Sequence, residues 1–178
     1  MPSVSISHVI LTVALLTLFI EIAFFTSTLT LKYNVRVLDD TLQDLAYVVQ
    51  ERVERVALFS KSLGYDRVVV LELGIPNIVG NRLYYMYLDE YADHVKVKVT
   101  CLTDQITSTT TPIYGVRTLA TISDADRVKI IELLSSMGIN IDYYGLRLYS
   151  GVSGKPIVWS IYYSSLDQVI VGLGWIET

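Results

Sequence analysis

A run of 61 residues without glycine or proline, from Ser3 to Leu63, constrains this chain more than any other feature of its sequence. Glycine and proline are the two residues that most strongly oppose a helix, and the rest of the chain contains both. At 1.5 Å per residue, a helix of this length is a rod of about 90 Å, which is longer than a compact domain of the same chain length. We therefore expect one long helix that continues into a separate domain.

The first half of this run is apolar enough for a membrane. Between Val4 and Leu31 the only ionisable side chains are Glu21 and His8. As a helix this segment spans about 42 Å, which exceeds the hydrocarbon thickness of about 30 Å. The sequence therefore predicts a transmembrane or filament-core helix over residues 1–33. A helix buried in a soluble core is the alternative.

A cleaved secretory signal is a competing interpretation of the same segment. Such a signal has a basic region before its apolar stretch and a small-residue cleavage site after it. No lysine or arginine precedes Lys32, and no Ala-x-Ala comes after the apolar run, so we expect the helix to be retained. Lys32 and Arg36 would favour a cytoplasmic location for the C-terminal part of the chain. That β-rich and tyrosine-rich part is nevertheless typical of an external domain, and we expect it outside the cell, at the membrane or in an extracellular filament.

Glu21 is the one acidic residue of the apolar segment. An ionised carboxylate near a bilayer centre costs several kcal/mol unless it is paired, protonated or hydrated. Thr17 and Thr28 lie within about 60° of it on a helical wheel, so the three residues form a thin polar stripe. We expect this stripe to contact another helix, or to sense charge, in an assembly. The alternative is a protonated glutamate tolerated near the membrane boundary.

The second half of the run, residues 34–64, has a heptad pattern. Arg52 is the only polar residue at a core position, and Val48, Ala46 and Ala57 widen the apolar stripe. A period of 3.5 residues is typical of coiled-coil packing. The helix could pack on sibling helices or, equally, along its own globular domain. The predicted seam consists of Val35, Leu38, Leu42, Leu45, Val49, Val56, Phe59 and Leu63.

In the remainder of the chain the apolar period changes to two, which is typical of strands. Asp104–Pro112 is expected to be a polar loop, and Ser123–Met137 a short helix capped by Ser123. The predicted fold class is α+β: a long N-terminal helix and an antiparallel β-sheet or sandwich head over residues 65–178, with one short helix. The predicted strands are Arg67–Leu73, Leu83–Leu88, Val95–Leu102, Ile113–Leu119, Ile139–Tyr149, Ile157–Tyr163 and Val169–Ile176.

Patterns that would indicate catalysis or cofactor binding do not occur in the sequence. The two histidines and the single cysteine lack metal-ligand spacing, and there is no nucleophile elbow, phosphate loop or dinucleotide fingerprint. Cys101 alternates with valines and is expected to be a small buried hydrophobe. The net charge is −4 and no basic run occurs, so we expect no nucleic-acid partner. We expect no enzyme activity, no cofactor and no metal site.

The 13 tyrosines are concentrated in the predicted strands. Adjacent tyrosines on a strand place one ring on each face of the sheet. Outward rings could form an interface or an adhesive surface. The simpler interpretation is packing between neighbouring strands.

The order of these parts resembles the plan of type IV pilin-like proteins, in which an apolar and then amphipathic N-terminal helix carries a β-rich head. Within Val68–Val99, the segments VVVLELGIPNIVG, NRLYYMYLDE and HVKVKV are similar to the head of archaeal members of this superfamily. The resemblance covers roughly the first 120 residues. It implies a subunit whose helices bundle into a filament core, or a filament-associated protein anchored in the membrane.

The start of the chain differs from the usual pre-pilin leader, which is short and basic and ends in Gly or Ala. Met1–His8 has neither feature. Thr17–Glu21 resembles the start of a mature pilin, which often has an acid at its fifth position. Cleavage after Leu16 would leave too few apolar residues to span a membrane. We therefore expect an uncleaved, pilin-like protein.

These patterns lead to two function hypotheses. The first is a structural subunit or membrane-anchored accessory of an archaeal type IV pilin-like cell-surface filament, either a pilus or an archaellum. It would form a homo-oligomer through its N-terminal helices, with the membrane and other filament or cell-envelope proteins as further partners. The second is a single-pass membrane receptor or scaffold whose coiled-coil stalk presents a β-domain outside the cell. The two differ in whether the apolar helix is surrounded by copies of itself or by lipid.

Overall fold

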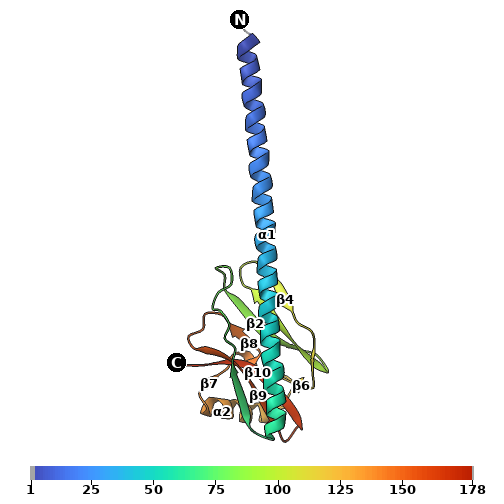
Figure 1. The fold of residues 1–178 in the computed structure, drawn as a ribbon. Helices are drawn as coiled ribbons and strands as arrows, with labels where there is room; N and C mark the ends of the chain where they lie inside the picture. Colours follow the sequence, from blue (N-terminus) through green and yellow to red (C-terminus); the bar gives the residue numbers. More distant parts are fainter. Residues whose placement is uncertain (1–2, 178) are drawn as a thin grey trace. The chain divides into compact units, whose positions relative to one another are not determined.

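The computed structural model describes residues 3–177, with side chains from Ile6 onward. The chain divides into two units, the first up to Leu38 and the second from Asp39 onward. The first unit is the beginning of helix α1 (Ser3–Leu63), and the second contains the rest of α1, two β-sheets and helix α2 (Asp124–Ser136) (Figure 1). The predicted α+β fold class is confirmed.

Helix α1 has the extent that the missing glycine and proline predict. It ends at Leu63, and Gly64 comes next with a φ of 89°, a left-handed conformation that glycine adopts without strain. We call the part of α1 that belongs to the second unit, Asp39–Leu63, the docked segment. We call the part from Ile6 to Leu31 the apolar segment.

The first sheet has the strand order β1–β9–β10–β6, and β7 also pairs with β10. β9 and β10 form its central hairpin, and Asp167 in their turn has a φ of 54°. The pairing of β10 with β6 is parallel, whereas the other pairs are antiparallel. The strands are β1 (Val68–Glu72), β6 (Val116–Arg117), β7 (Ile139–Asn140), β9 (Lys155–Tyr163) and β10 (Gln168–Ile176).

The second sheet has the strand order β4–β3–β2–β8, and β5 also pairs with β3. β3 alternates as the sequence predicts from His94 to Val99, with buried valines and partly exposed Lys96 and Lys98. The alternation ends at Thr100, which is expected to face outward but is buried beside Cys101. Cys101 is a free, buried thiol. The strands are β2 (Tyr84–Glu90), β3 (His94–Cys101), β4 (Thr107–Thr109), β5 (Ile113–Tyr114) and β8 (Arg147–Tyr149).

Two predicted strands are divided in the structure. Ile113–Leu119 is interrupted at Gly115, whose φ is 74°, so β5 joins the second sheet and β6 joins the first. Ile139–Tyr149 is divided into β7, a single 3₁₀ turn (η1, Tyr143–Gly145) and β8. Tyr143 and Tyr144 have φ values of 43° and 60°, which a strand does not accommodate.

The segment predicted as a polar loop contains the short strand β4. Its threonine and serine side chains carry no apolar alternation, so the period-two signal that marks the other strands is missing here. The prediction of a continuous loop over residues 104–112 was therefore wrong at its centre.

Helix α2 begins where its cap predicts. The Ser123 side chain accepts a hydrogen bond from the backbone N–H of Asp126 (3.2 Å) and donates one to the Asp126 carboxylate (2.6 Å). The hydrogen bond from Ser123 is the main cause that lowers the pKa of Asp126. The helix places Ile130 and Leu134 against the first sheet.

One hydrophobic cluster of the second unit lies between α2 and one face of the first sheet. Trp159 of β9 is fully buried there, and its indole N–H donates to the carbonyl of Leu173 (3.2 Å). Gly172 faces Trp159 on the paired strand, and a Cβ atom at that position would lie 2.3 Å from the indole ring. Gly172 therefore gives Trp159 the space it occupies.

The other face of the first sheet carries the docked segment. Ser160 is the residue after Trp159 on β9, so its side chain points to the opposite face. Its hydroxyl donates to the carbonyl of Val56 (2.7 Å) and shares a hydrogen bond with the Ser60 hydroxyl (2.9 Å). Both serines are fully buried. Around the first sheet the second unit thus has three layers, in the order docked segment, first sheet and α2.

The docked segment also contacts the second sheet. Ser108 of β4 donates to the Asp39 carboxylate (3.0 Å). Further along the chain, the Gln50 amide donates to the Thr111 hydroxyl (3.0 Å), two residues beyond β4. A single helix therefore joins the two sheets by contacts with both.

Candidate functional site

The apolar segment is an extended exposed surface within the described residues. All its described side chains are exposed except Thr28, which is half-buried. Phe19, Phe24 and Phe25 are among the most exposed. The helix that contains it is long and apolar enough to cross a membrane. A helix that is apolar on all faces is stable only in lipid or among other apolar surfaces.

The threonines of this segment make their hydrogen bonds within the helix. The Thr17 hydroxyl donates to the carbonyl of Val13 (2.9 Å), and that of Thr28 donates to the carbonyl of Phe24 (2.9 Å). The other threonine hydroxyls do the same one turn back, namely those of Thr12, Thr26 and Thr30. Thr17 and Thr28 were predicted to take part in a helix contact through a polar stripe. Their hydroxyl protons are already used, so only their oxygen lone pairs are open to a partner.

Glu21 differs from these threonines. Its side chain is exposed, and within residues 6–177 no hydrogen bond or ion pair reaches its carboxylate. Thr17 lies one helical turn before it and Thr28 two turns after it, so the three share one face of α1 as the sequence predicts. Glu21 is thus the one group of this stripe that has a strong need for an external partner.

The predicted seam of the second half is only partly buried. Leu38, Leu42, Leu45, Val49 and Val56 are buried, whereas Val35, Phe59 and Leu63 are exposed. Val53 and Ser60, which were not in the predicted seam, are fully buried instead, and the flanking Ala46 and Ala57 are also buried.

The reason is the pitch of a straight α-helix. A strict heptad drifts by about 20° per repeat relative to 3.6 residues per turn, and only supercoiling cancels this drift. The docked segment packs on a sheet, where nothing imposes a supercoil. Near the end of the helix the buried position is therefore Ser60 and not Phe59. Leu63, the last residue of the helix, is exposed, and no helical residue after it takes its place.

The outer face of the second sheet carries a row of tyrosines. The Tyr85 ring lies 6.0 Å from that of Tyr87 and 5.7 Å from that of Tyr149 between centroids. Lys98 lies over Tyr87, with its ammonium 5.5 Å from the ring centre, and also bonds the Asp89 carboxylate. The rings thus pack against one another and against Lys98 across neighbouring strands, and Tyr149 is also exposed to solvent.

The charges of this face are also paired among themselves. Burial alone would raise the pKa of Asp89, but hydrogen bonds from Lys98 and Tyr91 and the Lys98 charge lower it overall. The hydrogen bond to Asp89 in turn raises the pKa of Lys98. The Lys98–Asp89 pair at the centre of this face is therefore satisfied internally and does not indicate an ionic ligand.

His94 begins β3 and is held by its neighbours. Its Nδ1 lies 2.6 Å from the Asp93 carboxylate, and its ring stacks on Tyr91 at 4.8 Å between centroids. The hydrogen bond with His94 is the main cause that lowers the pKa of Asp93. Its Nε2 is buried and has no hydrogen-bond partner in residues 6–177. The interactions of His94 in the described residues are thus those with Asp93 and with neighbouring aromatic rings.

Glu90 is a buried acid that the sequence did not single out. The Thr121 hydroxyl (2.8 Å) and the Thr118 N–H (3.0 Å) and hydroxyl donate to its carboxylate, and Arg117 lies 3.4 Å away. These bonds tie the segment between β6 and α2 to the end of β2. A fully bonded buried carboxylate of this kind stabilises a loop and offers no free group for chemistry.

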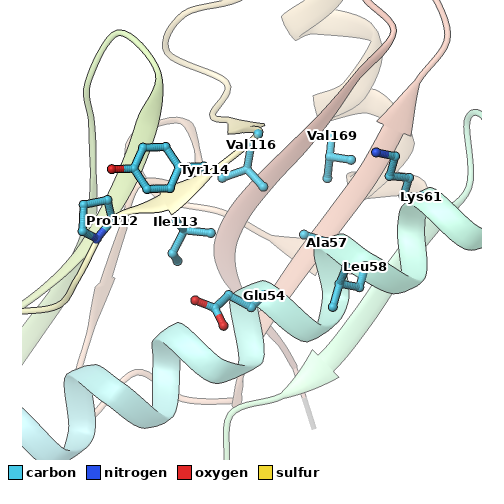
Figure 2. Close-up of a pocket in the computed structure, with 10 residues that line it drawn as sticks. Glu54, Ala57, Leu58, Lys61, Pro112, Ile113, Tyr114, Val116 and Val169 are labelled. Carbon is cyan, nitrogen blue, oxygen red and sulfur yellow. The ribbon is translucent and has the colours of Figure 1, made fainter.

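A groove of about 440 Å³ lies between the docked segment and the connection from β5 to β6. Figure 2 shows Glu54, Ala57, Leu58 and Lys61 on the helical wall, with Pro112 to Val116 opposite. Val169 of β10 also lines it. The groove has apolar sides with one acid and one base from the helix. No group of three or more metal-ligating side chains lies here or elsewhere in the described residues.

Comparisons with family models, with curated proteins and with solved structures found no match for this chain. The candidate functional surfaces are therefore those that the chain itself shows. They are the uncovered apolar segment with Glu21, and the surface of the second unit.

Proposed function

We propose that this chain is a structural subunit or a membrane-anchored accessory of an archaeal type IV pilin-like cell-surface filament, a pilus or an archaellum, and that it assembles through its N-terminal helix. The observation that carries this proposal is the contrast within α1. Its apolar segment is exposed on every face, whereas its docked segment buries one face against the chain's own sheets. An apolar surface of this width requires lipid or other apolar helices around it.

The contrast also bears on the receptor hypothesis. A coiled-coil stalk needs a free apolar seam along the helix. Leu42, Val49 and Val56 are fully buried, and the Val56 carbonyl is bonded to Ser160 of the first sheet. These positions are not open to a second helix, which favours the pilin-like plan over a receptor on a coiled-coil stalk.

Glu21 is proposed as the contact point between neighbouring helices in the assembly. The threonine hydroxyls beside it donate within their own helix. Its carboxylate is the remaining group whose transfer out of water has a large cost, and a donor on a neighbouring chain would remove that cost. In a filament the contact would therefore hold the register between copies.

The second unit is proposed to lie outside the cell, at the membrane or along the filament. Copies of this chain and other filament or cell-envelope proteins are its proposed partners. We propose a structural role without catalysis, cofactor or nucleic acid.

The direct test of this proposal is microscopy of sheared cell-surface material. Cells that produce the full chain are sheared, and the released fraction is examined by negative stain with an antibody against the second unit. Labelled filaments, or label at the base of filaments in the membrane fraction, are expected. Detergent-soluble dimers or trimers alone, with label spread over the membrane and no filaments, would contradict the proposal.

The role of Glu21 is tested with two variants. Glu21→Leu removes the carboxylate, and Glu21→Gln keeps its shape and its hydrogen-bonding oxygen. We expect Glu21→Leu to lower the assembled fraction while membrane insertion improves, and Glu21→Gln to lie between it and the natural chain. Thr17→Val is the matched control, because its hydroxyl bonds within the helix, and it should assemble normally. Unchanged assembly of Glu21→Leu would refute a pairing role.

Processing of the chain is tested by N-terminal sequencing of the protein recovered from membranes. We expect the sequence to begin at Met1. A start at Thr17 would show that a leader peptidase removes the segment before it and would place Glu21 fifth in the mature protein.

A further inference from the structure

The face of the docked segment that points away from the sheets is not a simple polar surface. It carries four large apolar side chains: Tyr47, Val48, Leu58 and Phe59, with exposed fractions of 48%, 39%, 71% and 55%. At 100° per residue these side chains lie within about 60° of a line through Asp44, opposite the buried stripe. Single exposed apolar residues are common, but two adjacent pairs on one helix face form a pattern.

The pattern repeats after eleven residues. Tyr47 and Val48 are matched by Leu58 and Phe59, and Asp44 is matched by Arg55. Eleven residues make about three turns, so the same face returns about 16 Å further along the helix. The apolar pair is thus repeated, while the charge that precedes it changes sign.

We infer that this face binds the same face of a second copy, with the two helices parallel and displaced by about eleven residues. Tyr47 and Val48 of one copy then lie beside Leu58 and Phe59 of its neighbour. Asp44 of the first copy lies beside Arg55 of the neighbour. This inference rests on the proposed function, because subunits of one filament share one chain direction and are displaced from one another along its axis.

Charge selects the displaced arrangement over the undisplaced one. Without displacement, Asp44 would face Asp44 and Arg55 would face Arg55, and like charges across a helix contact repel. With displacement, Asp44 gains an ion-pair partner, which it does not have among the described side chains. The displaced register also brings Asp40 toward Glu51. Arg55 bonds Glu51 at 2.6 Å within its own helix, so in this register its guanidinium is shared between Glu51 and the neighbour's Asp44.

The displacement has a consequence for assembly. In a pair of copies, one Tyr47–Val48 pair and one Leu58–Phe59 pair remain uncovered. Because the partner helix runs along the whole of this face, the contact joins two copies, and further copies would have to use other faces. An antiparallel pairing would instead set Glu51 against Arg55 in a closed dimer, and the test must distinguish the two.

Cysteine cross-linking of full-length chains in the sheared filament fraction makes this distinction. One chain carries Asp44→Cys and a second, differently tagged chain carries Arg55→Cys, and the two are produced together and oxidised. A disulfide requires Cα atoms within about 7 Å, so only adjacent residues react. We expect a disulfide-linked heterodimer as the main product, and no dimer from either variant alone. Cys101 stays in place because it is buried.

Two further pairs serve as controls. Asp44→Cys with Glu54→Cys places the second thiol about 80° from the line through Asp44 and about 100° from Arg55, and should not cross-link. Glu51→Cys with Arg55→Cys would cross-link in the antiparallel dimer. A heterodimer from that pair and none from the 44–55 pair would overturn the displaced arrangement.

The outcome separates this inference from the proposed function. Filaments that form without a 44–55 cross-link would overturn the inference and leave the filament role intact. Chains that stay monomeric in the membrane would overturn both. As a second measurement, Asp44→Arg should lower the assembled fraction a few-fold, and adding Arg55→Asp should restore it. A double variant as impaired as the single one would contradict the pairing of these residues.

Discussion

The two parts of helix α1 are built from similar apolar residues but are stabilised by different surroundings. The apolar segment carries apolar side chains on all faces, and no part of the described chain covers it. The docked segment carries a buried stripe on one face, and two sheets of the same chain cover that stripe. The difference shows that a continuous helix can be stabilised by different contacts along its length. The apolar side chains of the docked segment are covered by the chain's own sheets, whereas those of the apolar segment need lipid or other chains around them.

The largest effect that tests this comparison is a matched pair of truncations. Leu42→Ala removes a fully buried side chain of the docked segment, and we expect it to lower the free energy of unfolding of the second unit by about 2–5 kcal/mol. Leu18→Ala removes the same atoms from the exposed apolar segment and should leave that free energy unchanged. Denaturant unfolding of the full chain in detergent, monitored by the fluorescence of buried Trp159, measures both. Equal losses in the two variants would break the comparison.

A smaller effect is expected at the hydrogen bonds between the docked segment and the first sheet. Ser160→Ala leaves the buried Ser60 hydroxyl without its partner, and we expect a loss of about 1–2 kcal/mol. Ser62→Ala is the matched control, because the Ser62 hydroxyl is exposed and bonds within its own helix. Thermal unfolding should separate the two variants clearly. An unchanged unfolding temperature of Ser160→Ala would mean that this hydrogen bond does not stabilise the second unit.

The smallest effect concerns pH at the end of the docked segment. Tyr162 (2.7 Å) and Tyr65 (3.0 Å) donate hydrogen bonds to Asp167, and that from Tyr162 is the main cause that lowers the pKa of the carboxyl group. A lowered folded-state pKa gives stability that is present above the unfolded pKa of about 3.9 and is lost as pH falls below it. We therefore expect the second unit to weaken below about pH 4.

Asp167→Asn tests the origin of that loss. Because Asn does not titrate, the variant should be less stable than the natural chain at about pH 7 and should lose less stability between about pH 5 and pH 3. Asp89, Asp93 and Asp126 also have lowered pKa values, so part of the acid sensitivity should remain. An unchanged pH dependence would show that the tyrosine bonds to Asp167 do not act on stability.

Much of the fold could be predicted because the relevant signals are local. The extent of α1 follows from missing glycine and proline, the start of α2 from the Ser123 cap, and the buried face of β3 from alternation. The division of residues 139–149 could not be predicted, since Tyr143 and Tyr144 adopt a left-handed conformation that tyrosine rarely takes. The close approach of Trp159 to Gly172 depends on strand pairing, which no local pattern records.

Of the candidate surfaces, those marked by a local sequence signal could be predicted, and the one that depends on packing could not. Glu21 is conspicuous in sequence, because an acid among apolar residues is rare. Leu42 and Val49 of the predicted seam are buried but Phe59 is exposed, because a heptad template assumes a supercoil that packing on a sheet does not impose. The exposed face of the docked segment was missed. Its apolar pairs are recognisable only once the buried stripe is known.

Hydrogen exchange of α1 in the full chain tests the central claim most directly. In detergent micelles, amides of the docked segment should exchange through unfolding of the second unit, while those of the apolar segment should be protected by the micelle alone. Leu42→Ala should therefore accelerate exchange across Asp39–Leu63 by about 30-fold or more, the factor that corresponds to its loss of 2 kcal/mol or more, and leave Ile6–Leu31 unchanged. Acceleration of both segments by the same factor would contradict the account.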